Sequence, residues 1–207
     1  MDCCNPTRCS VVQCAMLTNK EKELIEKVCN GNTVAFSSLV DDYKDLVYTL
    51  SLRMLGNRED AEEVAQDVFI KVFTALRTFK GDSKLSTWMY RIAYNACLDR
   101  IKKNKKQRMH VEVEHVKKVA FMQMDNALDK MLQEERTILI NACLAKLPPE
   151  DVAIISLFYF EERSLLEMEK ILDLSANTIK VRLFRARKKL AIIMERNLDI
   201  EIVQSNG

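Results

Sequence analysis

Glycine and proline are scarce in this chain, with 4 and 3 occurrences among 207 residues. An all-β chain of this length needs many tight turns, and a dinucleotide-binding fold needs a glycine-rich phosphate loop, so the scarcity argues against both classes. Hydrophobic residues make up 48% of the sequence, which is enough to form a core in one or two domains. The composition therefore favours an all-α fold.

Long apolar runs are also missing. No hydrophobic stretch approaches the roughly 18 residues that span a bilayer, because a charged residue interrupts each one within about a helical turn. The N-terminus lacks the basic start, apolar core and small-residue cleavage site of a secretory signal. We therefore expect a cytoplasmic protein with no membrane insertion.

The seven cysteines do not indicate a disulfide framework, since their number is odd and Cys3, Cys4, Cys9 and Cys14 crowd the N-terminus. No histidine lies near these four, and their spacing is not that of a zinc-binding pair. We expect no metal and no cofactor. A disordered tail over residues 1–20 is the favoured interpretation, with metal binding or oxidant sensing as the alternative.

Helical periodicity predicts a first module of three helices over residues 21–106. Gly56 is suited to end the first helix, Asn57 can cap the second, and a polar loop at 80–84 leads to a third helix capped near Ser86. The expected apolar stripes are Phe36, Leu39, Val40, Tyr43, Val47, Leu50 and Met54; Ala61, Val64, Ala65, Val68, Phe69, Val72, Phe73 and Leu76; and Trp88, Met89, Ile92, Ala93, Ala96 and Ile101.

Periodicity fades after the first module. A basic run closes the third helix, and residues 107–133 are mixed, charged and irregular, which indicates a flexible linker. A second helical module is expected over residues 134–197, followed by a tail at 198–207. The predicted architecture is two small helical bundle domains joined by a flexible linker.

The second module carries the signature of a helix-turn-helix. Pro149 suits the first position of a helix, and Ser164 forms a capping box with Glu167 at the start of the next one. A turn at 173–175 then leads to a basic helix that Ser175 can cap. A short helix, a three-residue turn and a basic helix are typical of this DNA-binding motif.

The overall net charge of +2 hides segments of opposite sign. Residues 91–108 hold seven bases and one acid, residues 178–190 hold six bases and no acid, and residues 41–67 hold three bases and eight acids. Two cationic helices, one in each module, suit the phosphates of one nucleic acid at two places. The acidic helices suit a basic or mixed protein surface.

The basic last helix has two interpretations, a solvated face and a face that reads DNA. The upstream turn favours the second. Asparagine and arginine form bidentate hydrogen bonds with purine edges, and valine and phenylalanine contact thymine methyls. If Ile179 lies at the buried centre, the residues that point away from the core are Asn177, Val181, Phe184, Arg185 and Lys188. A protein interface remains the alternative for Phe184.

Aromatic side chains cluster around the loop of the first module, close to several bases. Rings on which bases stack, beside cations that follow the backbone, suit unpaired nucleotides. Core packing is the favoured interpretation for Trp88 and Phe79, whereas Tyr90 and Tyr94 are expected at or near the polar face and are the stronger contact candidates.

Several motifs resemble regions 2 and 4 of extracytoplasmic-function sigma factors. Residues 55–69 read LGNREDAEEVAQDVF, residues 79–81 read FKG and residues 86–95 read STWMYRIAYN, as in region 2. Residues 147–151 read LPPED and residues 174–190 read LSANTIKVRLFRARKKL, as in region 4. The resemblance covers residues 21–106 and 134–195, in order and at the family's spacing.

This resemblance implies a sigma factor and not an enzyme. Such a factor binds the core of bacterial RNA polymerase through the beta-prime clamp helices and the beta flap, recognises the minus-thirty-five and minus-ten promoter elements, and supports promoter melting and transcription initiation. It also implies an anti-sigma factor that covers both modules. The polymerase-binding residues that it implies are Asp60, Glu63, Val64, Asp67, Val68 and Lys71.

The resemblance also assigns the two DNA-binding sites. The helix-turn-helix would read the minus-thirty-five duplex through Ser175, Asn177, Thr178, Lys180, Val181, Arg182, Phe184, Arg185 and Lys188. The loop and third helix of the first module would capture the melted minus-ten strand through Lys80, Asp82, Ser83, Lys84, Thr87, Trp88, Tyr90, Arg91, Tyr94, Asn95, Arg100 and Lys103.

Two residues depart from the family pattern, with Glu169 in place of the usual Ala and Asp173 in place of the turn Gly. Aspartate tolerates a left-handed turn. Glu169 either extends outward or alters the helix crossing.

Three rival functions are a transcriptional repressor, an enzyme, and a degenerate homologue that only titrates polymerase or an inhibitor. The enzyme is disfavoured because His110 and His115 lie in the linker, no phosphate-binding loop is present, and the scattered carboxylates form no acid/base pair.

Overall fold

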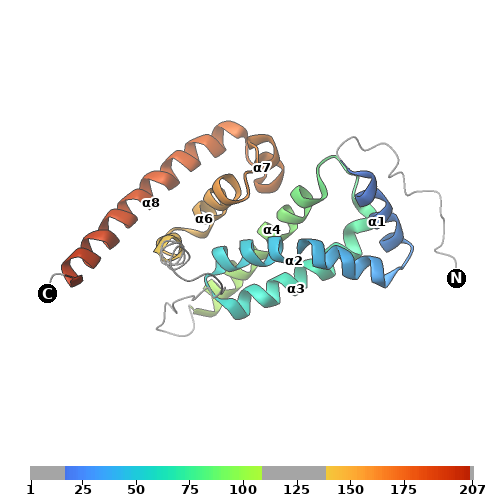
Figure 1. The fold of residues 1–207 in the computed structure, drawn as a ribbon, viewed down its shortest axis with the longest axis horizontal. Helices are drawn as coiled ribbons and strands as arrows, with labels where there is room; N and C mark the ends of the chain where they lie inside the picture. Colours follow the sequence, from blue (N-terminus) through green and yellow to red (C-terminus); the bar gives the residue numbers. More distant parts are fainter. Residues whose placement is uncertain (1–16, 109–138, 206–207) are drawn as a thin grey trace.

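The computed structural model describes residues 17–108 and 139–205, with side chains for 17–106 and 139–196. Regular structure within these ranges is entirely helical, which confirms the all-α fold class (Figure 1). The predicted N-terminal tail falls outside the described residues up to position 16, and the predicted linker falls outside them except for residues 107 and 108.

The first module opens with a short helix whose start is fixed by local hydrogen bonds. Helix α1, Asn19–Cys29, follows Thr18, and Thr18 and Glu21 form a reciprocal capping box. Ile25 and Val28 are the buried side chains of this helix. Helix α1 packs on α2, Thr33–Leu55, and so covers one end of the bundle.

The two long helices of the first module form a hairpin. Gly56 follows α2 with φ 63°, a left-handed conformation that costs glycine little, and Asn57 Oδ1 accepts hydrogen bonds from the backbone N–H groups of Glu59 and Asp60. Helix α3, Arg58–Ala75, then runs back along α2, and a 3₁₀ turn, Leu76–Thr78, completes it.

Helix α4, Leu85–Arg108, packs against both α2 and α3. It begins at Leu85, close to the cap expected near Ser86, and Ser86 itself lies inside the first turn. The buried side chains Met89, Ala93 and Cys97 recur every four residues along α4 and close the core of the first module.

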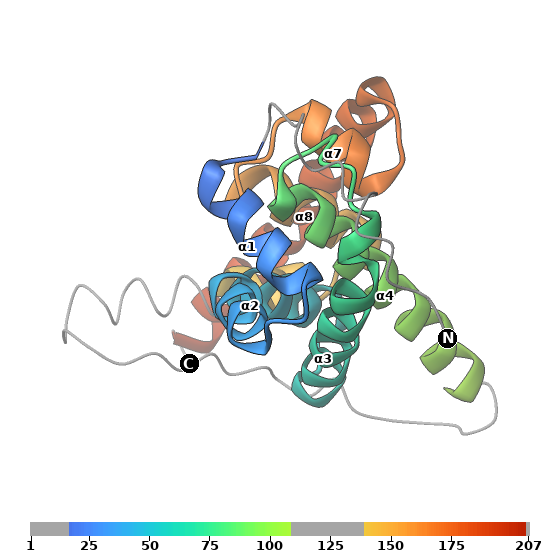
Figure 2. The ribbon, with the colours of Figure 1, turned by 90° about the vertical axis from the view of Figure 1, so that its right-hand side faces the viewer.

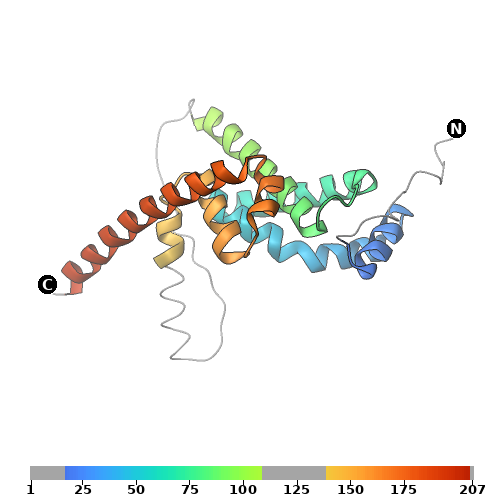
Figure 3. The same ribbon diagram turned by 90° about the horizontal axis from the view of Figure 1, so that it is seen from above.

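The second module begins with helical residues 139–144 and continues in α6, Pro149–Ile155, where Pro149 occupies the start as predicted. A π-helical turn, Ser156–Phe160, leads toward α7, Leu165–Leu172, whose capping box joins Ser164 and Glu167. Helix α8, Ala176–Ser205, follows the turn and continues beyond residue 197, where the sequence placed the end of this module (Figure 3).

The two modules lie against each other. Helix α4 packs on α7, and α2 packs on α6, so the helix-turn-helix side of the second module covers part of the first (Figure 2). Periodicity had predicted two separate bundles and gave no indication of this contact. None of the helices in the described part of the chain is long and apolar enough to cross a membrane.

Candidate nucleic-acid interface

The outer face of α8 is exposed and basic. Ile179, Leu183 and Ala186 are buried against the second module, which fixes the rotation of the helix. As a result, Asn177, Thr178, Lys180, Arg185 and Lys188 are exposed, as are two large apolar side chains, Val181 and Phe184, with exposed fractions of 49% and 62%. Polar and apolar groups on one helix face suit the major groove of a duplex.

Two further residues of the predicted DNA-binding set, Ser175 and Arg182, make contacts within the second module. Ser175 Oγ accepts a hydrogen bond from the backbone N–H of Thr178 at 3.3 Å, which is the predicted cap. Arg182 is half-buried and forms an ion pair with Glu150 at 3.7 Å, so its guanidinium is shared with α6.

Glu169 serves as a second cap for α8. Its carboxylate accepts a hydrogen bond from the backbone N–H of Ala176, the first residue of the helix. A negative charge at a helix N-terminus is stabilised by the orphan N–H groups and by the helix dipole. Asp173 adopts φ 56°, so it takes the left-handed conformation that the turn requires. Both departures from the family pattern are thus accommodated in the turn.

The loop before α4 and the first turns of that helix present a second polar surface. Lys80, Asp82, Lys84, Arg91 and Asn95 are exposed, and Ser83 is half-buried. Lys103 is exposed further along α4. The half-buried Trp88 ring packs on Phe79 with centroids 5.0 Å apart. This contact agrees with the core-packing interpretation for both rings.

The expectation that Tyr90 and Tyr94 lie at the polar face is wrong for this arrangement of modules. Tyr90 is fully buried, and the exposed fractions of Tyr94 and Thr87 are only 7% and 1%. The reason is that α4 is covered on two sides, by α2 and α3 within its module and by α7 from the other. Burial raises the pKa of both tyrosines, and for Tyr90 a hydrogen bond to Glu161 adds to the effect.

The acidic helix α3 presents part of its predicted contact set. Glu63, Asp67 and Lys71 are exposed, whereas Val64 and Val68 are buried at 2% and 0%. These two valines pack inside the first module and cannot touch a partner directly. Their place on the surface is taken by Ile70, which the periodicity did not single out.

Phe73 was predicted to be buried on the same helix, but it is 47% exposed. Its ring packs on Phe36 of α2 in an edge-to-face contact with centroids 4.9 Å apart. The hydrophobic periodicity predicts that every apolar residue of the stripe on α3 is buried. The last turns of this helix lie at the edge of the bundle, so Phe73 stays partly exposed there.

Asp60 and Glu63 form ion pairs within the first module. Arg100 on α4 contacts the carboxylate of Asp60 at 3.4 Å and also pairs with Glu63. The hydrogen bond from Arg100 lowers the pKa of Glu63 and raises the pKa of Arg100. Arg100 was predicted to bind the melted strand, but its side chain is only 12% exposed. In this structure it connects α4 to α3 through its two ion pairs.

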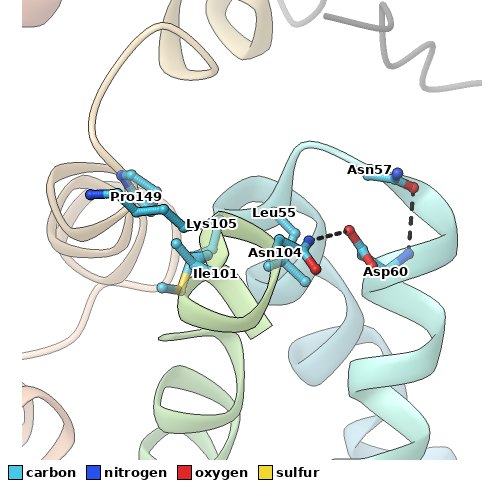
Figure 4. A pocket seen from close by; sticks show the side chains of 8 residues that line it. Leu55, Asn57, Asp60, Ile101, Asn104, Lys105 and Pro149 are labelled. Atoms are coloured by element: carbon cyan, nitrogen blue, oxygen red, sulfur yellow. Dashed lines mark hydrogen bonds between the residues drawn. The ribbon is translucent and has the colours of Figure 1, made fainter. Parts of the chain in front are cut away.

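A shallow cavity of about 270 Å³ lies next to these ion pairs, between the ends of α2 and α4 and the start of α6 (Figure 4). Asn104 donates to Asp60 at 2.9 Å, and Pro149 closes the far side. The lining offers no pair of catalytic groups. Across the described ranges of the chain, no group of three His, Cys, Asp or Glu side chains could hold a metal.

Sequence reasoning missed the residues that join the modules. Glu161 lies beside Arg53 and Tyr90, and Arg163 lies over the Tyr90 ring. These residues are 71 to 108 positions apart in sequence, and no local periodicity reports such a contact. The charged run that follows an apolar helix at 161–163 was the available signal, and it is typical of any loop.

The chain matches family descriptions in both modules: "Sigma-70 region 2" over residues 39–107 and "Sigma-70, region 4" over residues 137–190. It is 37% identical over 175 residues to the ECF RNA polymerase sigma factor SigW of Bacillus subtilis, covering 82% of this chain and 94% of the relative. The chain belongs to the extracytoplasmic-function sigma factors of the sigma-70 family. It therefore directs promoter recognition and transcription initiation and is not an enzyme.

Other comparisons agree with this sigma factor assignment. The RNA polymerase sigma-H factor of Pseudomonas aeruginosa is 30% identical over 183 residues, covering 84% of this chain and 94% of the relative. Among solved structures, the sigma factor RpoE in complex with the anti-sigma factor NepR from Bartonella quintana has a TM-score of 0.65 at 19% identity, covering 77% of this chain and 96% of that one. CnrH in complex with the cytosolic domain of CnrY has a TM-score of 0.59 at 24% identity, covering 84% and 96%. These structures share the fold.

Proposed function

We propose that the exposed face of α8 reads the minus-thirty-five element as duplex DNA. The observation that carries this assignment is the coincidence of a helix-turn-helix with an outward face of Asn177, Val181, Phe184, Arg185 and Lys188. The full proposed set is Ser175, Asn177, Thr178, Lys180, Val181, Arg182, Phe184, Arg185 and Lys188. Arg182 contributes its charge beside Glu150 and acts at the rim of the contact.

The loop at 80–84 and the first turns of α4 would hold the melted minus-ten strand. Cations at Lys80, Lys84 and Arg91 can follow the phosphates, and the half-buried ring of Trp88 offers a stacking edge beside them. Thr87, Tyr90 and Tyr94 belong to the same proposed surface but are covered in this arrangement. Strand capture through them therefore requires a change in the position of the second module.

Polymerase binding is assigned to the outer face of α3. Its exposed charges at Glu63, Asp67 and Lys71 flank the exposed apolar groups Ile70 and Phe73, and a mixed face of this kind suits a protein partner. Val64 and Val68 support the face from inside. The expected partners are the clamp helices of the beta-prime subunit, with the beta flap as the partner of the second module.

The remaining assignments follow from the family. The proposed domains are region 2 at 21–106, a linker at 107–133 and region 4 at 134–197, flanked by tails at 1–20 and 198–207. A chain that acts on RNA polymerase works in the cytoplasm. An anti-sigma factor is the proposed inhibitor, and the sigma factor RpoE from Bartonella quintana, which has the same fold, has been solved in complex with the anti-sigma factor NepR.

Transcription in vitro tests the whole proposal. Start sites mapped after overexpression of the chain would supply a cognate promoter. Core RNA polymerase with the purified chain should then initiate at that promoter. Inhibition without initiation would instead identify a homologue that only titrates polymerase.

The helix face is tested by Arg185→Ala, which should weaken binding of minus-thirty-five duplex by about 1–3 kcal/mol, because one base contact is lost. Lys27→Ala on α1 removes a positive charge far from α8 and serves as the control. Fluorescence anisotropy with the mapped duplex measures both variants. Equal affinities for the two variants would contradict the assigned face.

A further inference from the structure

Two carboxylates from outside α8 bind groups of that helix that could otherwise contact phosphate. Asp151 on α6 forms an ion pair with Lys189 at 2.7 Å. Glu169 on α7 accepts a hydrogen bond from the backbone N–H of Ala176, the first residue of α8. Each carboxylate therefore places a negative charge against a helix whose proposed ligand, duplex DNA, is a polyanion.

The contact with Asp151 neutralises one edge of α8. The Asp151 side chain is only 14% exposed, so its carboxylate is held by the module, whereas Lys189 is 52% exposed. On the same edge, two turns earlier, Arg182 lies 3.7 Å from the carboxylate of Glu150. A lysine strengthens DNA binding when it neutralises a phosphate and releases the counterions there. Lys189 has to leave Asp151 before it can do this.

The opposite edge of α8 keeps its charge. Lys180 precedes Lys189 by about two and a half turns of helix, so the two side chains lie on opposite sides. Lys180 is exposed, and no acidic side chain in the described part of the chain forms an ion pair with it. The charge that is available to phosphates is therefore uneven across the helix.

The start of α8 is closed to phosphate in a second way. A helix N-terminus attracts anions because its first N–H groups have no partner within the helix and the positive end of the dipole lies there. In α8 the N–H of Ala176 donates to Glu169, and the N–H of Thr178 donates to Ser175 Oγ at 3.3 Å. A phosphate at this end would meet donors that are already bound and a carboxylate of like charge.

This arrangement affects cognate and other DNA differently. On a cognate site, the base contacts of the outer face fix how α8 lies in the groove. On any other sequence only phosphates hold the helix, which then takes the orientation that brings most cations to them. Groups withheld from phosphate therefore cost more affinity on non-cognate DNA, where other orientations would use them.

We propose that Asp151 and Glu169 are specificity-determining residues, which limit sequence-independent binding by keeping Lys189 and the N-terminus of α8 away from DNA phosphates. The ligand that they reject is the sugar–phosphate backbone of a duplex of any sequence. Neither residue belongs to the proposed set of DNA contacts. This inference rests on the proposed duplex-reading function of α8.

Binding of two duplexes by the full-length chain tests this role. One is the mapped minus-thirty-five duplex, and the other has the same composition in scrambled order. Fluorescence anisotropy measures both over a range of salt. Asp151→Asn frees Lys189, so it should raise affinity for the scrambled duplex by up to about eightfold at about 0.1 M salt and steepen the log–log salt dependence by about 0.9, the value for one phosphate. Affinity for the cognate duplex should rise less.

Two control variants separate this effect from a change in net charge. Glu23→Gln on α1 frees Lys27 from an exposed ion pair and makes the same change in net charge far from α8, so it should leave both affinities unchanged. Asp151→Asn combined with Lys189→Gln removes the pair as a whole. The salt dependence of that double variant should return to the wild-type value.

Glu169→Gln tests the second carboxylate. It removes the charge but keeps a side-chain oxygen for the N–H of Ala176, so it should also raise affinity for the scrambled duplex. A merely structural role predicts the opposite sign, because a helix with a looser start would bind both duplexes more weakly. Circular dichroism at rising temperature checks that each variant is folded.

The outcomes separate this role from the function on which it rests. Unchanged or weaker binding of the scrambled duplex by either folded single variant would overturn the role of the carboxylate that it lacks. An equal rise in affinity for both duplexes would overturn the role in specificity. A wild-type chain that does not distinguish the two duplexes would overturn the proposed reading function of α8, and this role with it.

Discussion

At the scale of single residues, capping groups fix where the helices begin, and most of them can be read from the sequence. Ser164 and Ser175 were predicted because each partner lies three residues away. Glu169 could not be read in this way, since its partner, the backbone N–H of Ala176, lies seven residues on, across the turn. A side chain that reaches over a turn depends on the geometry of the turn, which the sequence does not specify.

The cap formed by Glu169 should contribute measurably to stability. Glu169→Ala removes the acceptor for the first N–H of α8 and should lower the free energy of unfolding by about 1 kcal/mol. Glu169→Gln keeps a side-chain oxygen of the same reach and should lose less. Urea unfolding followed by circular dichroism compares the two. A Gln variant that is as unstable as the Ala variant would show that the hydrogen bond is not the source of the effect.

At the scale of the helix, hydrophobic periodicity alone predicted the long helices and most of their buried residues. Leu39, Val47 and Leu50 on α2, and Met89 and Ala93 on α4, are all buried as their spacing predicts. The errors occur where a helix has more than one covered face or reaches an edge. Tyr90 is buried by a partner from the other module, and Phe73 is exposed at the end of α3. Both outcomes depend on tertiary packing that a periodic pattern cannot encode.

The two faces of α3 should respond differently to substitution. Val68→Ala leaves a cavity at a fully buried site and should lower the free energy of unfolding by about 1–3 kcal/mol. Asp67→Lys changes an exposed charge, so stability should stay within about 0.5 kcal/mol. Affinity for core RNA polymerase should nevertheless fall in Asp67→Lys.

Urea unfolding measures the stability of both variants, and pull-down with core enzyme measures how well each one binds polymerase. Unchanged capture of polymerase by folded Asp67→Lys would remove that residue from the proposed contact set.

At the scale of the whole molecule, the contact between the modules is the least predictable feature. It joins α2 and α4 to the segment at 160–170, and every pair in it is more than 70 residues apart in sequence. The sequence specified two modules, the helix-turn-helix and the charge of each surface. It could not specify which surface faces which, because that choice depends on the shapes of both folded modules together.

The contact between the modules should respond to acid through Glu167. Partial burial acts to raise the pKa of Glu167, but hydrogen bonds from Lys84 and Ser164 outweigh it and lower the pKa to about 2. A carboxyl whose pKa is depressed on folding stabilises the protein above its unfolded value of about 4.5. That contribution should be lost as the pH falls from about 4.5 toward 2.

Unfolding in urea at pH 6 and at pH 3 checks this dependence, with Glu167→Gln as the reference. The wild type should be the more stable protein at pH 6, and the difference should shrink at pH 3. A difference that is independent of pH would assign the effect to packing of the side chain and not to its charge.

Helix α8 continues well past the residues that we propose to face the DNA. Thirty residues from Ala176 to Ser205 correspond to a rod of about 45 Å at 1.5 Å per residue. Its far half projects away from the rest of the molecule, as Figures 1 and 3 show. From Lys188 to the last helical residue the rod measures about 25 Å. A fluorophore fused behind Ser205 would therefore lie away from the proposed DNA-binding face of α8. Because the helix is rigid, its signal would report the orientation of that face on the promoter.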